Sequence, residues 1–170
     1  LEIKRYIENE RPRRAVVAGG GYIGLEMAEN LKRAGIETTV AEISEHLIPS
    51  LDSDMAANVH VHIRERGIDL RLNNGIKGII PGRALLEDGE LETDMVIICA
   101  GVRPDTQFLE GCLPLNERGC IITDSHMRTG VPGIYAVGDA AGIKNYLTGE
   151  PAFIPLAGPA NKQGRIAADN

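Results

Sequence analysis

The sequence predicts an α/β protein whose core is a parallel β-sheet covered on both faces. Residues 15–18 and 95–100 are short apolar stretches with the composition of doubly buried strands. Between them, strand-like and helix-like patterns alternate along the chain, which is typical of parallel sheets. A glycine turn joins the first strand directly to a helix. These observations favour a Rossmann-like sheet in which a β-meander replaces one crossover helix.

The first elements follow from apolar spacing and from helix-stop residues. Residues 1–10 are expected to form an amphipathic helix that ends before Pro12. The helix after the glycine turn should end at Gly35, and a second strand is expected at residues 38–41. On that helix, three residues are spaced to face the sheet: Leu25, Ala28 and Leu31.

A further helix is expected at residues 54–66, with Asp52 or Ser53 as its cap and Gly67 as its stop. Its apolar residues at helical spacing are Met55, Val59 and Ile63. Alternation predicts a third strand at residues 68–72.

Residues 76–94 contain two turn signals, Pro81-Gly82 and Asp88-Gly89, between short apolar stretches. This pattern predicts a small antiparallel meander. The strand at residues 95–100 is expected to be buried on both faces and to complete a sheet of four parallel strands.

The rest of the chain has a different character. Residues 113–129 are turn-rich, Ile134–Val137 is predicted as a short buried strand, and residues 160–170 are predicted as a helix. These strands are too few for a sheet of their own. The sequence starts without Met and inside a helix, so we expect it to be part of a longer chain.

The glycine turn carries the main functional prediction. Gly19, Gly21 and Gly24 form G-x-G-x-x-G, in which the glycines serve the tight turn, close approach of a pyrophosphate, and helix–strand packing. The following helix directs its free N–H groups at phosphates. Glu42 ends the next strand, where a ribose-binding acid is expected. The alternative is a glycine-rich turn that binds no ligand.

The overall composition excludes several classes of partner. The chain has 170 residues, 43% of them hydrophobic, and a net charge of −6, which argues against nucleic acid and anionic membranes. The longest apolar run is too short to span a bilayer. Three cysteines without paired spacing suggest a reducing, cytoplasmic setting.

No metal site or catalytic cysteine is predicted. His60 and His62 lie on nearly opposite faces of one helix, so they are interpreted as surface or half-buried residues. Cys99 is interpreted as a small filler within a buried strand, while Cys112 and Cys120 lie in turn-rich sequence without an activating group.

Three motifs occur in a characteristic order: Gly-Gly-Gly-Tyr-Ile-Gly-Leu-Glu at 19–26, Cys-Ala-Gly-Val-Arg-Pro-Asp at 99–105, and Ile-Tyr-Ala-Val-Gly-Asp-Ala-Ala at 134–141. Together they resemble the flavoprotein pyridine nucleotide–disulfide oxidoreductases. Residues 155–170 are similar to the branch that holds coenzyme A-disulfide reductases, NADH oxidases and NADH peroxidases.

The resemblance implies a division into two parts. Residues 1–102 would be an NAD(H)-binding domain with a leading helix, and residues 103–170 an incomplete second segment belonging to an FAD-binding domain. The first half of the FAD domain, the redox-active cysteine and the C-terminal dimerisation domain would be absent from this sequence. The complete protein would be a homodimer.

The resemblance also implies residue roles. Residues implied for NAD are Gly19, Gly21, Tyr22, Ile23, Gly24, Glu26, Glu42 and Gly101; residues implied for FAD are Gly138, Asp139, Ala152 and Phe153. Tyr22 would gate the flavin ring, Glu26 would lie near the nicotinamide–flavin contact, and Asp139 would bind the flavin ribityl chain. Alternatively, Tyr22 is a surface aromatic residue, Glu26 a solvated acid and Asp139 a helix cap. No residue of this chain is assigned as catalytic.

A carboxylate at Glu42 with no arginine after it favours NADH over NADPH. The implied reaction passes a hydride from NADH to flavin and on to a disulfide, peroxide or dioxygen, and this chain by itself is expected to bind NADH without turnover. Three alternatives remain: a ferredoxin- or rubredoxin-reductase-like flavoprotein, a non-catalytic NAD-sensing module, and an S-adenosylmethionine-binding methyltransferase-like domain. The Gly138-Asp139 segment argues against the last.

Overall fold

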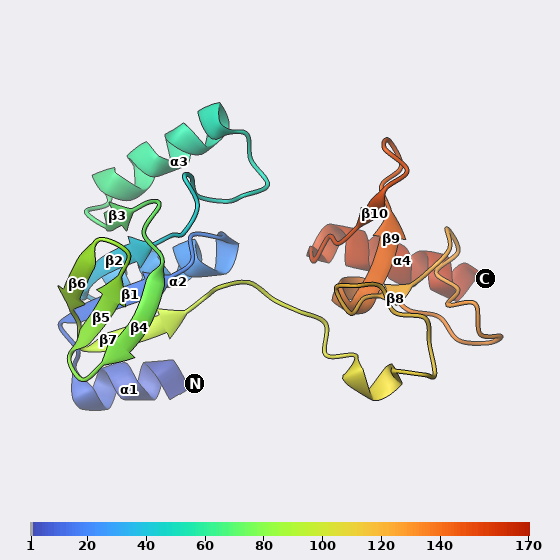
Figure 1. The fold of residues 1–170 in the computed structure, drawn as a ribbon, viewed down its shortest axis with the longest axis horizontal. Helices are drawn as coiled ribbons and strands as arrows, with labels where there is room; N and C mark the ends of the chain where they lie inside the picture. Colours follow the sequence, from blue (N-terminus) through green and yellow to red (C-terminus); the bar gives the residue numbers. More distant parts are fainter. Residues whose placement is uncertain (1) are drawn as a thin grey trace. The chain divides into compact units, whose positions relative to one another are not determined.

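The computed structural model describes residues 2–170, which fold into two compact units (Figure 1). The first unit ends at Gly101, and the second spans Val102–Asn170. Each unit contains its own buried hydrophobic residues.

The first unit is built on a four-stranded parallel sheet with the strand order β3-β2-β1-β7. The strands are β1 (Arg14–Ala18), β2 (Glu37–Ala41), β3 (Asp69–Arg71) and β7 (Met95–Ile98). Strand β1 is central, because Val17 pairs with Val40 on one side and Ile97 on the other. The predicted α/β class with a parallel sheet is therefore confirmed.

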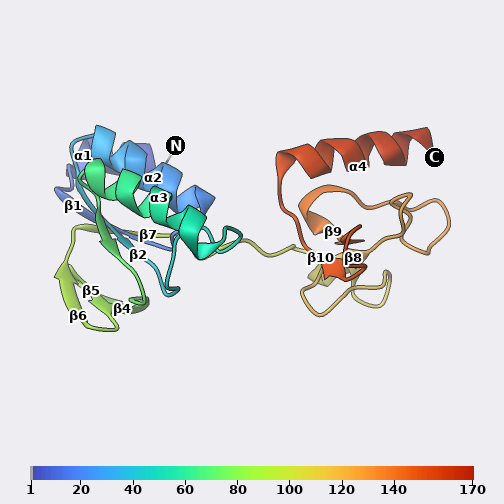
Figure 2. The ribbon, with the colours of Figure 1, turned by 90° about the horizontal axis from the view of Figure 1, so that it is seen from above.

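Different elements cover the two faces of this sheet (Figure 2). Helices α1 (Glu2–Glu10), α2 (Tyr22–Arg33) and α3 (Ser53–Glu65) lie on one face. The predicted meander is confirmed on the other face, as antiparallel strands β4 (Ile76–Ile80), β5 (Arg83–Leu86) and β6 (Gly89–Glu92). Successive side chains of a strand point to opposite faces of the sheet. Val17 therefore packs against the helices, and its neighbour Val16 packs against the meander.

Both long helices of this unit end at the predicted glycines. At the end of α2, Gly35 has a φ of 82° and donates to Lys32 O, while Ile36 donates to Leu31 O. This pair of bonds is a Schellman motif, which needs a left-handed residue at the stop position. Helix α3 ends in the same way at Gly67, which has a φ of 70°.

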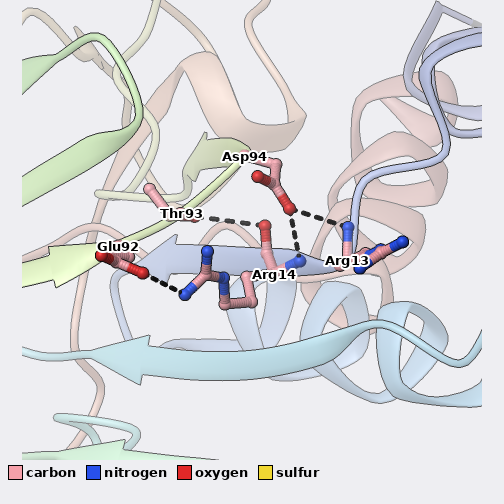
Figure 3. A network of polar contacts seen from close by, with 5 residues as sticks. All are labelled: Arg13, Arg14, Glu92, Thr93 and Asp94. Carbon is pink, nitrogen blue, oxygen red and sulfur yellow. Dashed lines mark hydrogen bonds and ion pairs between the residues drawn. The ribbon is translucent and has the colours of Figure 1, made fainter.

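A polar network joins the start of β1 to the end of the meander (Figure 3). One carboxylate oxygen of Asp94 accepts hydrogen bonds from the backbone N–H groups of Arg13 and Arg14, at 2.8 and 2.9 Å. The Arg14 guanidinium pairs with Glu92, and the Thr93 hydroxyl donates to Arg14 O at 3.2 Å. The network therefore fixes where β7 begins beside β1.

Three features of the first unit add to or differ from what the sequence pattern indicates. The strand expected to be buried on both faces is an edge strand, β7, and Ile98 at its end is 68% exposed. Met55 lies on the outer side of α3 at 58% exposure, and Ala56 is the residue buried in that turn. Asp52 occupies the N-cap position of α3, but its side chain makes no capping hydrogen bond.

The second unit contains short elements around a small core. Strand β9 (Ala141–Lys144) lies between β8 (Ile121–Ile122), which runs parallel to it, and β10 (Pro151–Ala152), which is antiparallel. The remaining elements are the 3-10 helices η1 (Gln107–Leu109) and η2 (Gly138–Ala140) and the helix α4 (Ala157–Asp169).

The predicted buried strand Ile134–Val137 is absent. Only one isolated antiparallel bridge forms there, between Tyr135 and Arg128, and Ile134 and Val137 are 43% and 40% exposed. Strand β9, which was not predicted, lies just beyond it. Across residues 2–170, the structure shows no helix with the length and apolar character that a bilayer crossing would require.

Candidate functional site

The glycine turn lies where β1 ends and α2 begins, at the carboxyl edge of the parallel sheet. Gly19 has a φ of 108° and donates to Ala41 O at 2.8 Å. A Cβ on Gly19 would lie 2.5 Å from Cys99 O, and a Cβ on Gly24 would overlap Gly19 O. Gly19 thus permits the turn, and Gly24 permits close packing of helix and strand.

Gly21 has different surroundings. It has an extended conformation with a φ of −77°, and a Cβ added there would meet no atom within 4 Å. Gly21 is also the N-cap residue of α2, and no side chain caps this helix end. The first N–H groups of α2 are therefore left for another acceptor, next to open space.

Glu42 is hydrogen-bonded directly to this turn. It is 6% exposed at the end of β2. Its Oε2 accepts the Gly20 N–H at 2.5 Å, and its Oε1 accepts the Ser44 N–H at 2.8 Å. Each oxygen of an ionised carboxylate has two acceptor sites, so Glu42 can also accept bonds from ligand hydroxyls. The predicted glycine turn and acid are thus brought together.

The segment of residues 43–52, called the support loop below, also contacts the glycine turn. The Ile48 N–H donates to Gly20 O at 3.0 Å. Leu47 is fully buried, and its Cδ2 occupies the space that a Cβ on Gly20 would need. The Leu47 N–H in turn donates to Nε2 of His60 on α3 at 3.1 Å.

Sequence reasoning missed this contact. His60 is half-buried, as expected, but its ring accepts a bond from a residue thirteen positions away. Burial lowers the pKa of His60 below its ordinary value, and the positive charges of Arg64 and His46 lower it further. A neutral ring with a free Nε2 is the form that accepts this bond.

The other residues implied for NAD are exposed at the same end of the sheet. Tyr22 and Ile23, in the first turn of α2, are 58% and 55% exposed, and Glu26 is also exposed. Gly101 is exposed with a φ of 99°. These side chains are accessible to a ligand.

The four residues implied for FAD all lie in the second unit. Asp139 is exposed on η2, whose N-cap is Val137, so Asp139 is not the helix cap that was considered. Gly138 has a φ of 76°, and its N–H donates to Oε1 of the buried Gln163 at 2.7 Å. Ala152 and Phe153 are half-buried.

Two hollows occur within the second unit. One of about 1430 Å³ is lined by residues of β8, β9 and α4 and by the intervening loops. The other, of about 370 Å³, is lined by Phe153 together with Arg103 and Arg118. Neither hollow was predicted from the sequence, because each depends on how distant loops meet.

The three cysteines differ in burial. Cys99 is half-buried beyond the end of β7 rather than inside a buried strand, and burial raises its pKa. Cys112 is exposed and Cys120 is buried. Among residues 2–170, His, Cys, Asp and Glu side chains form no group of three or more that could hold a metal ion.

Comparison with known proteins identifies one family. Residues 2–164 match the family model described as pyridine nucleotide-disulphide oxidoreductase. An NADH oxidase of Methanocaldococcus jannaschii is 35% identical over 99% of this chain and 39% of its own length. A CoA-dependent NAD(P)H sulfur oxidoreductase of Pyrococcus abyssi is 33% identical over 100% of this chain and 39% of its own length. This chain therefore spans about two fifths of these relatives.

Solved structures agree with this match. The crystal structure of reduced Bacillus anthracis CoADR-RHD superposes with a TM-score of 0.93 at 41% sequence identity. The match covers 99% of this chain and 31% of that one.

Proposed function

Because the chain belongs to the pyridine nucleotide-disulphide oxidoreductase family, we propose that its first unit binds NAD(H) within an FAD-dependent oxidoreductase. Bound NADH would supply a hydride that bound FAD accepts and passes on to a disulfide, peroxide or dioxygen. In this proposal the first unit is the NAD(H)-binding domain, and the second unit is part of an FAD-binding domain.

The observation that carries the proposal is the open space at Gly21 beside the buried carboxylate of Glu42. A pyrophosphate can approach the Gly21 backbone, because no side chain of the described residues fills that space. The uncapped start of α2 offers N–H groups to it. Glu42 lies on the adjacent strand end, where the ribose hydroxyls of a dinucleotide would bind.

We propose that NADH is preferred over NADPH. A 2′-phosphate would have to approach a carboxylate that is only 6% exposed, and charge repulsion is weakly screened there. The next two residues, Ile43 and Ser44, supply no cation to bind the phosphate. The match to an NAD(P)H-dependent relative makes this preference worth measuring directly.

In the second unit, Gly138, Asp139, Ala152 and Phe153 would contribute to binding FAD. The exposed Asp139 carboxylate can accept bonds from ribityl hydroxyls, and Gly138 provides a backbone conformation that bulkier residues avoid. Tyr22 and Glu26, which lie in the accessible first turns of α2, would contact the nicotinamide side of the site. The complete oxidoreductase would be a cytoplasmic homodimer.

Fluorescence titration with NADH and NADPH tests the proposal. The wild-type chain should bind NADH at least about tenfold more tightly than NADPH, since an acid at this position selects against the 2′-phosphate. Glu42→Ala should remove most of this preference. Glu45→Ala, an exposed acid of the support loop, is the matched control and should keep the wild-type preference.

The outcomes separate the alternatives. Binding of neither nucleotide would contradict the proposed role of the first unit. With FAD added, the chain should not oxidise NADH at an enzymatic rate, and rapid turnover would contradict the division proposed here. Restoring the remaining domains should produce turnover; continued inactivity would favour a sensing module, and electron transfer only to a small redox protein would favour a ferredoxin-reductase-like enzyme.

A further inference from the structure

A chain of hydrogen bonds leads from helix α3 to the glycine turn. His60 Nε2 accepts the Leu47 N–H at 3.1 Å. The next residue, Ile48, donates its N–H to Gly20 O at 3.0 Å. The Gly20 N–H then donates to Glu42 Oε2 at 2.5 Å. Three segments that are separate in the sequence are thus linked at the candidate pyrophosphate site: helix α3, the glycine turn, and Glu42 with the support loop that follows it.

We propose that His60 is a positioning residue for the dinucleotide turn, acting through Leu47 and Ile48 of the support loop. It would hold Gly20 in place, so that the Gly21 backbone stays open to the pyrophosphate. The part of this inference that concerns ligand affinity depends on the proposed NAD(H) function, whereas the part that concerns the geometry of the turn does not.

The support loop needs such a contact because its backbone is strained. Ile48 has a φ of 50°, a left-handed conformation that β-branched residues adopt only when their surroundings impose it. Ile48 is 8% exposed, and Leu47 is completely buried. Without the His60 acceptor, the Leu47 N–H would be buried without its present partner, which favours rearrangement of the loop.

Movement of the loop would reach the turn directly. The Leu47 side chain packs into the space beside Gly20, and the Ile48 N–H holds the Gly20 carbonyl. If residues 47 and 48 shift, Gly20 loses both contacts, and its N–H bond to Glu42 is left with less support and opens more readily. The peptide that precedes Gly21 would then be free to turn.

This contact should respond to pH, because a protonated ring cannot accept the Leu47 N–H. The charged and titratable groups facing the ring are Arg64 from α3 and His46 from the support loop, and both lower the pKa of His60. The contact is therefore intact at pH 7 and is lost as the pH falls through the lowered pKa of His60, which lies below the ordinary histidine value of 6.5.

The test compares three variants of the full chain. His60→Ala removes the acceptor, and His60→Gln can restore it through its side-chain oxygen. His62→Ala is the matched control, because it removes an exposed imidazole from the same helix. Two properties are measured between pH 5 and pH 8: NADH affinity by fluorescence, and amide hydrogen-exchange protection at Gly20, Leu47 and Ile48 by NMR.

For His60→Ala at pH 7.5, we expect about three- to tenfold weaker NADH binding and about tenfold lower protection at the three amides. His60→Gln should recover most of both properties and should lose the pH dependence below about pH 6.5 that the wild type shows. His62→Ala should match the wild type in protection and affinity.

Unchanged protection at Gly20 and Ile48 in His60→Ala would overturn the inference, as would an equal loss in His62→Ala. NADH affinity that is independent of His60, despite lost protection, would also overturn the positioning role. If the wild type binds no NADH, the proposed function fails, while the protection data still decide whether His60 holds the turn.

Discussion

Single residues of the glycine turn are required for different physical reasons. Neither Gly19 nor Gly24 can carry a side chain, because a Cβ at either position would clash with backbone atoms of the protein. Gly21 has no such neighbour and an ordinary φ of −77°. In the proposed function its lack of a side chain would serve only the ligand, and this difference can be measured.

We predict that Gly24→Ala and Gly21→Ala separate stability from binding. Gly24→Ala forces a Cβ against Gly19 O and should lower the free energy of unfolding by about 1–3 kcal/mol or more. Gly21→Ala should leave the free energy of unfolding unchanged or raise it slightly, because the backbone conformation of Gly21 suits alanine. Its NADH affinity should fall at least about tenfold. Urea denaturation measures the stability of each variant, and NADH titration measures its affinity. Tight NADH binding by Gly21→Ala would show that the pyrophosphate lies elsewhere.

A second residue-scale prediction concerns Asp94, which binds the backbone N–H groups of Arg14 and Arg13. These bonds hold the pKa of Asp94 below its ordinary value of 3.8. The folded state therefore favours the ionised form, so this stabilisation is complete above about pH 4 and is lost as the pH falls through the lowered pKa.

Asp94→Asn should consequently lower Tm at pH 7, and its deficit relative to the wild type should shrink as the pH falls below about 3.8. Thermal unfolding across this pH range provides the measurement. Asp88→Asn, at an exposed aspartate of the meander turn, should follow the wild type. A deficit for Asp94→Asn that stays constant with pH would contradict the role of the charge.

The amino-acid pattern predicted correctly the position of residues that are brought together by neighbouring elements of the sequence. The glycine spacing and the acid at the end of β2 could be predicted, because a strand–turn–helix unit brings them together locally. The contact of His60 with Leu47 could not be predicted, because nothing in the sequence specifies the path of the support loop. The left-handed Ile48 likewise has no sequence signal.

At the scale of elements, strands and helices of the first unit were predictable where local signals agreed. Gly35 and Gly67 ended their helices as expected, because each adopts the left-handed conformation of a Schellman motif. Burial was less predictable. Met55 and Ile63 belong to the same series of apolar residues at helical spacing, but of these two only Ile63 packs against the core. In the first turn of α3 the buried residue is Ala56, and Met55 points outward.

This difference yields a prediction about packing. Leu31 on α2 is 1% exposed within the helix-side core, so Leu31→Ala should cost about 2–5 kcal/mol of unfolding free energy. Met55→Ala, at an apolar residue that is 58% exposed, should change it by less than about 0.5 kcal/mol. Urea denaturation followed by circular dichroism compares them. A large effect of Met55→Ala would mean that a partner covers this face of α3.

At the scale of the whole molecule, prediction succeeded for the first unit and was poorer for the second. The first unit has regular alternation of strands and helices, which local patterns can report. The second unit has strands of two to four residues, and their pairing depends on distant segments: β8 and β9 are separated by a long loop. The stretch Ile134–Val137 looked like a strand but has only one bridge partner, so the apolar composition was misleading there.

The separate cores of the two units lead to a final prediction. Hydrophobic clusters of the first unit include only residues before Gly101, and the cluster of the second unit includes only residues after Val102. A shortened chain of residues 1–101 should therefore fold, with a Tm near that of the corresponding transition in the full chain.

The shortened chain should also keep the NADH affinity of the full chain within about threefold, because Gly21, Glu42 and the support loop all belong to it. Thermal unfolding and fluorescence titration of both chains provide the comparison, with Glu42→Ala in the short chain as the control for specific binding. A folded short chain that binds no NADH, beside a full chain that does, would show that residues after Gly101 complete the nucleotide site. An unfolded short chain would instead show that the first unit depends on the second for its stability.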